Sequence, residues 1–222
     1  MPNRAAELAW DEPTGPSGDG LTRARIVETA LAVADAEGLD AVSIRRVAAE
    51  LETRPMSLYS HIAAKEDLVA LMLNEVSGRG LVREPLSGNW REAMGQIARA
   101  AYSVYLDHPW ALSAFGTGPR AGPNLLRRAE QSAQAVEGLG LEPADAWTAL
   151  RIMHEWTMGH ALHAITLRED DQLEDQMRRA DPDEFPLTSG VIQASKGQPA
   201  DEVFETALAV VLDGIATHFD LP

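Results

Sequence analysis

Three short helical patterns near the start of the chain most constrain what it can fold into. They cover residues 22–37, 43–51 and 53–62, and each opens with a serine or threonine that can cap a helix. Apolar residues recur at helical spacing within each pattern, so each helix has one face for a shared core. Two short helices joined by a tight turn, the second polar on its outer face, are typical of a helix-turn-helix that reads DNA.

The rest of the chain also predicts helices and contains no convincing strand. A polar stretch, 169–199, is expected to hold a short helix near its start and then a loop. The other helical patterns cover residues 65–79, 89–107, 110–115, 124–137, 143–168 and 201–219. We therefore expect an all-α protein. It would have a disordered tail (1–20), a three-helix helix-turn-helix domain (21–66) and a helical ligand-binding and dimerisation domain (67–222).

Composition excludes several classes of function. Cysteine is absent from the 222 residues, which rules out disulfides, thiolate metal sites and a cysteine nucleophile. The N-terminus lacks the apolar core of a signal peptide, and no apolar run reaches the roughly 18 residues of a membrane span. We expect a soluble, cytoplasmic protein that does not enter a membrane and needs no cofactor.

The charge is unevenly distributed along the chain. The formal net charge is −15, which by itself disfavours binding to DNA phosphates. Between Leu21 and Lys65, however, six basic and six acidic side chains balance. The excess of acid thus lies outside the helix-turn-helix, although a neutral segment is only weak evidence for DNA binding.

Geometry suggests which side chains reach double-stranded DNA. If Leu58 and Ile62 face the core, the residues between and before them are free to approach base edges or phosphates. Arg45, early in the second helix, is long enough to contact a guanine edge. Ordinary helical domains also contain this geometry, so a purely structural role stays open. The predicted DNA-binding residues are Arg45, Arg54, Met56, Ser57, Tyr59, Ser60, His61 and Lys65.

The stretch SIRRVAAELETRPMSLYSHIAAKEDL resembles the DNA-binding unit of the tetracycline-repressor (TetR) family. Its most specific part is Leu58-Tyr59-x-His61-Ile62, followed by Lys65 and Leu68. The resemblance implies that Tyr59 and Lys65 grip phosphates and that the residues before the tyrosine face bases. It also implies a ligand-responsive regulator, most simply a repressor released from its operator by a small-molecule effector; an activator would bind DNA in the same way.

A weaker resemblance to the tetracycline-binding repressors continues into the C-terminal part. It rests on Trp90, Tyr102, His108-Pro109, Gly116-Thr117-x-Pro119 and a long helix containing Gly159. In those repressors a Gly-Thr-Arg-Pro loop and a preceding histidine help bind magnesium–tetracycline. Here position 118 is Gly118, Ala114 replaces the histidine, and His163 stands where an acidic residue is expected. These departures argue against magnesium–tetracycline, and no metal site is predicted.

Most of the aromatic residues lie between Trp90 and His163, where an apolar effector pocket is expected. Any of them could instead belong to an ordinary core or a dimer interface. His160 and His163 are one helical turn apart and could bind a metal or a carboxylate, although interface packing is the commoner role. The predicted ligand-binding residues are Trp110, Phe115, Thr117, Trp156 and His160.

Dimerisation is expected because a helix-turn-helix protein usually needs two copies to read two half-sites. The long helices 143–168 and 201–219 are broadly apolar, and two from each subunit could form a four-helix bundle. Packing of these helices within one subunit is the alternative. An enzyme is not expected, because the chain has no phosphate loop and the spacing from His154 to Met158 breaks the zinc-protease motif. A helical interaction module without DNA binding is the remaining alternative.

Overall fold

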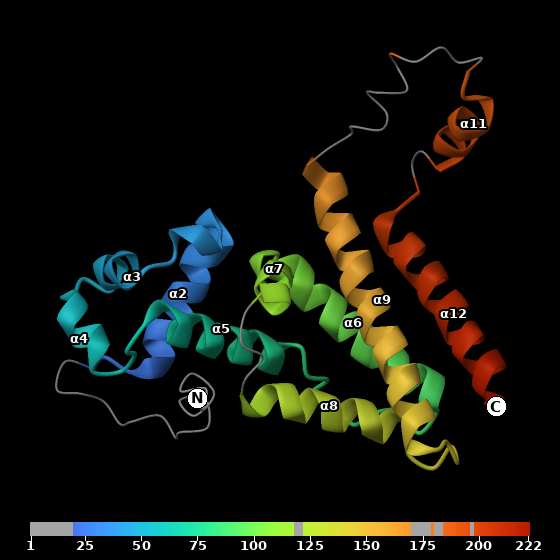
Figure 1. Cartoon of the computed structure of the whole chain (residues 1–222), viewed down its shortest axis with the longest axis horizontal. Helices are drawn as coiled ribbons and strands as arrows, with labels where there is room; N and C mark the ends of the chain where they lie inside the picture. Colours follow the sequence, from blue (N-terminus) through green and yellow to red (C-terminus); the bar gives the residue numbers. More distant parts are fainter. Residues whose placement is uncertain (1–19, 118–121, 170–178, 180–183, 196–197) are drawn as a thin grey trace. The chain divides into compact units, whose positions relative to one another are not determined.

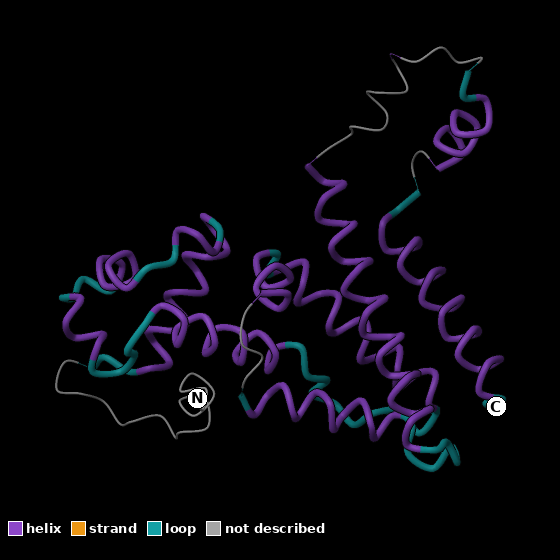
Figure 2. Tube along the Cα trace, in the orientation of Figure 1, coloured by secondary structure: helices purple, strands orange, loops and turns teal. Residues whose placement is uncertain are grey.

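The computed structural model describes residues 20–117, 122–169, 179, 184–195 and 198–222. The tail expected to be disordered therefore lies, but for Gly20, outside the described residues, as does the short helix expected near residue 170. All regular structure in the described ranges is helical, with no strand among them (Figure 2). The expected all-α fold is confirmed.

Backbone packing divides the chain into two compact units, Met1–Gly138 and Leu139–Pro222. The sequence separated DNA reading from ligand binding near residue 66, well before this boundary. The compact unit extends further because α5 (Lys65–Arg79) packs on α2 (Arg23–Glu37) on one side and on α8 (Pro123–Ala135) on the other (Figure 1). Through these contacts α5 joins α2 to α8 within the first unit.

The first three helices follow their predicted caps, with one exception. The Thr22 hydroxyl oxygen accepts a hydrogen bond from the Arg25 backbone N–H at the start of α2. The Ser43 hydroxyl oxygen accepts one from the Arg46 backbone N–H at the start of α3 (Ile44–Glu50). A short 3₁₀ turn, η1 (Leu39–Ala41), connects them. The third helix, α4 (Pro55–Tyr59), is shorter than expected and has Arg54 at its N-cap rather than Thr53.

The shortening of α4 has a local cause at each end. The Thr53 N–H donates to Ala48 O, so this residue belongs to the turn after α3. At the other end the amides of His61 and Ile62 both donate to the Leu58 carbonyl, which closes the helix with a tight final turn. The helix α4 is therefore a five-residue helix that lies between two turns.

The remainder of the first unit surrounds α5. Asn89 caps α6 (Trp90–Asp107) by accepting from the Arg91 and Glu92 amides, as the spacing predicted. His108-Pro109 ends α6, and α7 (Trp110–Thr117) follows at once. Both α7 and α8 contact α5, and α5 also contacts α2, so α5 lies between α2 and the later helices of this unit.

The second unit is built on two long helices in mutual contact, α9 (Pro143–Glu169) and α12 (Ala200–Phe219). Phe204, Leu208, Leu212 and Ile215 form the buried stripe of α12. A further helix, α11 (Pro186–Ser195), lies where a loop was expected. That prediction was wrong because it took proline as a sign of a loop. Pro186 occupies the first turn of α11, where a missing N–H costs no hydrogen bond.

Candidate functional site

A buried core holds α3 and α4 at a fixed relation to each other. Ile44, Val47 and Ala48 from α3 and Leu58 from α4 are buried, together with Ile62 just beyond it. In the turn between them Glu52 adopts a left-handed backbone (φ 51°), an uncommon conformation for a residue other than glycine. The two helices therefore form a small rigid head with defined inner and outer faces.

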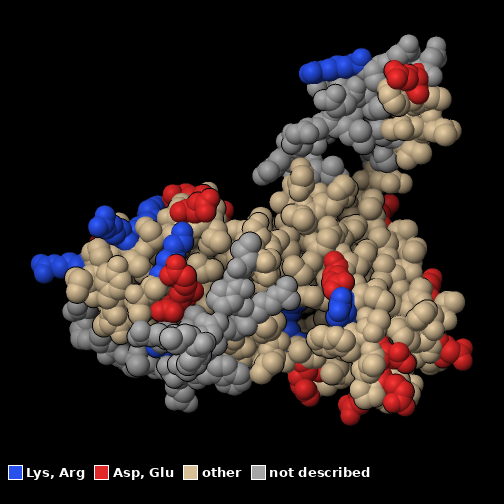
Figure 3. Space-filling model, viewed as in Figure 1, with Lys and Arg blue, Asp and Glu red and all other residues tan. Residues whose placement is uncertain are grey.

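The outer face of this head carries most of the predicted DNA-binding residues. Met56 is 75% exposed and Tyr59 is 49% exposed, although both are large apolar side chains. Arg45, Arg54 and Ser60 are exposed as well. Figure 3 shows Lys and Arg side chains gathered over the part of the first unit that carries α3 and α4. Exposed aromatic, thioether and guanidinium groups on one short helical head suit contact with a DNA groove.

Two other predicted residues, Ser57 and Lys65, lie partly inside the head. Ser57 is half-buried and its carbonyl accepts a hydrogen bond from the Ser60 hydroxyl at 2.7 Å. Lys65, also half-buried, begins α5 and its Nζ lies 3.5 Å from the Leu39 carbonyl oxygen. This weak contact holds the ammonium group at the base of the head, beside the turn that precedes α3.

His61 differs from its expected position. It was expected to be free to reach a phosphate, but it is only 8% exposed. Both ring nitrogens are buried without a hydrogen-bond partner in the described structure. The cause is the spacing: His61 follows the buried Leu58 by three residues and directly precedes the buried Ile62, so it turns toward the same side as these two residues.

Arg46 is a residue that the sequence analysis passed over. Its guanidinium pairs with Glu37 of α2 at 2.6 Å and with Glu50, one turn along α3. The hydrogen bonds that Arg46 donates to these carboxylates, the one to Glu37 foremost, raise the pKa of Arg46. The i,i+4 spacing of Arg46 and Glu50 was the available signal. Arg46 thus fastens α3 to α2, whereas its neighbour Arg45 extends into solvent.

Two predicted effector residues lie on α7 in the first unit. Trp110 is buried, and its indole N–H donates to Asp35 Oδ1 on α2 at 2.7 Å. Phe115 is buried against Tyr105 of α6, edge to face, with ring centroids 6.2 Å apart. The Thr117 side chain and the loop residues 118–121 lie outside the described residues.

The other two predicted effector residues lie in the second unit. Trp156 on α9 stacks on Phe204 of α12 with ring centroids 5.4 Å apart, and His160 contacts both rings. Burial, and secondarily the proximity of His163, lowers the pKa of His160 below its usual 6.5. A neutral imidazole among aromatic rings is well suited to contact an apolar or aromatic molecule. Phe204 is an addition to the predicted effector residues, because its ring contacts both Trp156 and His160.

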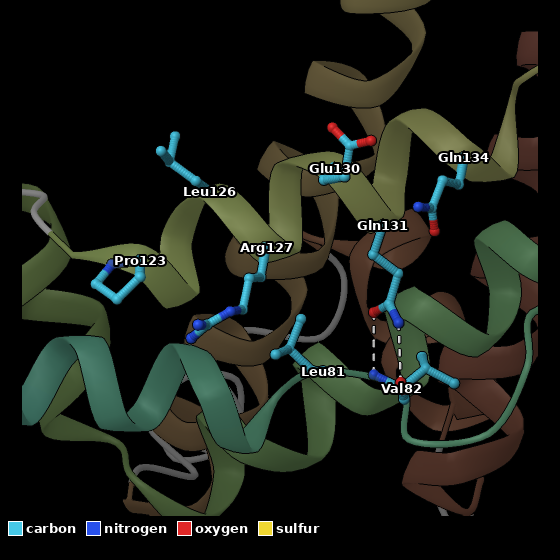
Figure 4. A pocket seen from close by; sticks show the side chains of 8 residues that line it. All are labelled: Leu81, Val82, Pro123, Leu126, Arg127, Glu130, Gln131 and Gln134. Atoms are coloured by element: carbon cyan, nitrogen blue, oxygen red, sulfur yellow. Dashed lines mark hydrogen bonds between the residues drawn. The ribbon is translucent and has the colours of Figure 1, made fainter. Parts of the chain in front are cut away.

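A hollow of about 560 Å³ opens on the first unit between α8 and the loop that follows α5. Figure 4 shows Gln131 spanning one end, where its side-chain amide makes paired hydrogen bonds with the backbone of Val82. None of the predicted effector residues lines this hollow. Within the described residues no group of three or more potential ligands is placed to hold a metal ion. Nor is any described helix both long and apolar enough to span a membrane.

An all-helical chain with a rigid, partly basic helix-turn-helix head and aromatic clusters beyond it defines the class of one-component DNA-binding regulators. Comparisons with known proteins agree. Residues 26–72 match the family model for bacterial regulatory proteins of the tetR family. Residues 84–219 match the tetracyclin repressor-like C-terminal domain.

Individual relatives give the same result. The chain is 35% identical over 173 residues to the HTH-type transcriptional repressor DrrR1 of Streptomyces coeruleorubidus, covering 76% of this chain and 64% of DrrR1. It is 31% identical over 185 residues to an HTH-type transcriptional regulator of Saccharopolyspora erythraea, covering 80% and 77%. ActR of Streptomyces coelicolor is 28% identical. Its complex with actinorhodin superposes with a TM-score of 0.74, covering 90% of this chain and 97% of ActR. Its complex with (S)-DNPA gives 0.75, covering 92% and 100%.

The chain belongs to the TetR family of transcriptional regulators. This membership confirms the expected class, a DNA-binding regulator rather than an enzyme.

Proposed function

We propose that this protein is a homodimeric, cytoplasmic repressor that leaves its DNA operator when a small molecule binds. The observation that carries the proposal is the head formed by α3 and α4. Ile44, Val47, Ala48 and Leu58 form its buried apolar core, and its outer face exposes Arg45, Met56 and Tyr59. Contact with a DNA groove would bury Met56 and Tyr59 and so be favourable. Large exposed apolar side chains that gather on one surface usually mark an interaction site.

The residues of the head divide between two kinds of DNA contact. We assign Arg45 and Arg54 to base edges, with Met56, Ser57 and Ser60 beside them in the major groove. Tyr59 and Lys65 are assigned to phosphates, which set the register of the protein on the duplex. His61 takes a phosphate only if the end of α4 opens, because its ring is buried in the described conformation. Pro55 and Met56 offer no side-chain donors, so part of the readout would rest on thymine methyls and DNA shape.

In the first unit we assign effector contacts to Trp110, Phe115 and Thr117. In the second unit we assign them to Trp156 and His160. The tight ring contacts among Trp156, His160 and Phe204 favour a molecule with an aromatic or otherwise flat apolar surface. ActR forms complexes with actinorhodin and with (S)-DNPA, so these two compounds are reasonable first probes for this chain.

The dimer is assigned to α9 and α12. Val203, Val210 and Gly214 share one exposed face of α12, opposite its buried stripe. Ile152, Gly159 and Leu162 are likewise exposed along α9. An added Cβ at Gly159 or Gly214 would meet nothing within 4 Å in this chain. Because an exposed glycine weakens a helix, both positions make sense if a partner helix approaches closely there.

Regulation would follow from a two-state equilibrium. The effector must bind one arrangement of the heads more tightly than the other, and DNA must prefer the opposite arrangement. The helix α5 is suited to carry the change, because it begins at Lys65 beside the head and contacts both α7 and α8. A coupling of a few kcal/mol is sufficient for release.

The first experiment is a selection of genomic DNA fragments by the purified full-length protein at controlled salt, read by sequencing. Recovery of a palindromic site supports the proposal. The site is then titrated with protein in the presence of actinorhodin or (S)-DNPA, and loss of binding identifies a releasing ligand. A Tyr59→Ala, Lys65→Ala double variant is the control and should lose the site. If the double variant still binds with unchanged affinity, the assignment of the head as the DNA-binding surface is wrong.

A further inference from the structure

One carboxylate oxygen joins the reading head to the start of α7. Asp35 Oδ1, in the last turn of α2, accepts the indole N–H of Trp110 at 2.7 Å and contacts His108 Nδ1 at 2.7 Å. The two donors flank Pro109, at the junction of α6 and α7. This contact spans 75 positions in sequence and brings α2 against α7, the helix that carries two candidate effector residues.

Hydrogen-bonding chemistry makes the junction specific. The indole N–H of Trp110 can only donate, and the side chain is buried, so it has no solvent to turn to if Asp35 withdraws. His108 is also buried, and its other nitrogen lies 3.5 Å from an Arg79 guanidinium nitrogen. The guanidinium can only donate a hydrogen bond, so His108 Nε2 is the acceptor. His108 Nδ1 then carries the hydrogen and donates its hydrogen bond to Asp35. Each group therefore has one role in this arrangement.

The path continues from Asp35 into the head. Two residues further along α2, Glu37 pairs with Arg46 of α3 at 2.6 Å. Arg46 is the direct neighbour of Arg45, which the proposed function assigns to base edges. A displacement of α7 that moved Trp110 would thus either break the bonds to Asp35 or move the end of α2 and, through Glu37, the start of α3.

We propose that Asp35 is the positioning residue that couples α7 to the reading head. This inference deepens the proposed function, since it names the contact through which effector binding would reach the DNA-binding helices. Asp35 itself touches neither DNA nor effector in this scheme. It sets the orientation of α2 according to where Trp110 lies.

The test is a mutant cycle between Asp35 and Trp110, read at a distance from both. Trp110→Phe removes the N–H and keeps an aromatic ring, and Asp35→Ala removes the acceptor. Amide hydrogen exchange is measured in the peptides covering residues 43–60, with the peptides of α12 as an internal reference. Asp40→Asn is the matched control, because it removes an acidic charge from an exposed position on the same head.

The expected result is that each single variant speeds exchange in residues 43–60 by about tenfold, the effect of losing a charge-assisted hydrogen bond. The double variant should be no faster than either single variant, and Asp40→Asn should match wild type. The proposal is wrong if the effects of the two single variants on the exchange rate multiply in the double variant. It is also wrong if Trp110→Phe leaves the exchange rate of residues 43–60 unchanged. Circular dichroism confirms folding, and if Asp35→Ala does not fold, Trp110→Phe by itself decides the proposal.

The exchange measurement requires neither an operator nor an effector. It therefore decides the role of Asp35 even if the genomic selection recovers no DNA site. Where a site is recovered, its affinity for the same four variants should follow the exchange pattern, with Trp110→Phe altering affinity only in the presence of Asp35.

Discussion

Asn124, in the first turn of α8, and Asn74, in the middle of α5, each satisfy a backbone group of the other. The Asn124 backbone N–H donates to Asn74 Oδ1 at 3.0 Å, and Asn124 Nδ2 donates to the Asn74 carbonyl at 2.9 Å. The N-cap of α8 is Gly122, which has no side chain to offer. Asn74 therefore supplies a capping acceptor from another helix, and α8 begins where α5 allows it.

This contact predicts a specific loss of stability. Asn74→Ala removes the acceptor and leaves an amide at the start of α8 unpaired, so the free energy of unfolding should fall by about 1–3 kcal/mol. Urea unfolding followed by circular dichroism measures the change. Gln134→Ala, on the exposed face of α8, is the control and should change stability by less than about 0.5 kcal/mol. Equal effects of the two variants would contradict the capping role of Asn74.

Neighbouring arginines on α3 should affect DNA binding in different ways. Arg45 is exposed, so Arg45→Ala should cost about 1–3 kcal/mol at a contacted base pair and leave stability unchanged. Arg46 pairs with Glu37 and Glu50, so Arg46→Ala should loosen the head and weaken binding to all sequences alike. Fluorescence anisotropy on the selected site and on single-base variants of it separates the two patterns. If Arg45→Ala weakens binding to every base variant equally, Arg45 contacts the backbone instead.

The proposed dimer can be tested on one face of α12. Gly214→Leu places a large side chain on the face shared with Val203 and Val210, where the isolated chain leaves open space. If a second subunit packs there, the variant should sediment as a monomer at concentrations where the wild type is a dimer. Ala209→Leu, also exposed but on the flank of α12, serves as the matched control. A Gly214→Leu variant that remains fully dimeric would exclude this face.

The imidazole of His160 should make stability depend on pH. Burial lowers its pKa in the folded state below 6.5, so the unfolded chain binds a proton first as pH falls. The free energy of unfolding should therefore decrease as pH drops below about 6.5 and become constant again once the folded form is also protonated. His160→Gln should flatten this part of the profile, and His218→Gln, at an exposed position on α12, should not. Urea unfolding at a series of pH values, followed by circular dichroism, measures the profile.

Local pattern was enough to predict most helices. Thr22, Ser43 and Asn89 cap the helices that were expected to follow them, because capping depends on a side chain and amides only two or three residues away. The Leu58-Tyr59-x-His61-Ile62 motif indicated the TetR family for the same reason: its spacing is a property of the chain itself. The failures were also local, since Pro186 opens α11 within a stretch interpreted as loop.

The candidate site was only partly predictable. Exposure of Arg45, Met56 and Tyr59 follows from helical periodicity, but the burial of His61 depends on how far the tertiary core extends around Leu58 and Ile62. No periodicity predicts that Trp110 donates to Asp35 or that Asn74 caps α8, because these partners are 75 and 50 positions apart. The sequence alone determined the helices, their caps and the family. The tertiary structure decided which polar groups meet, because hydrogen bonds between distant helices form only where apolar packing has brought those helices together.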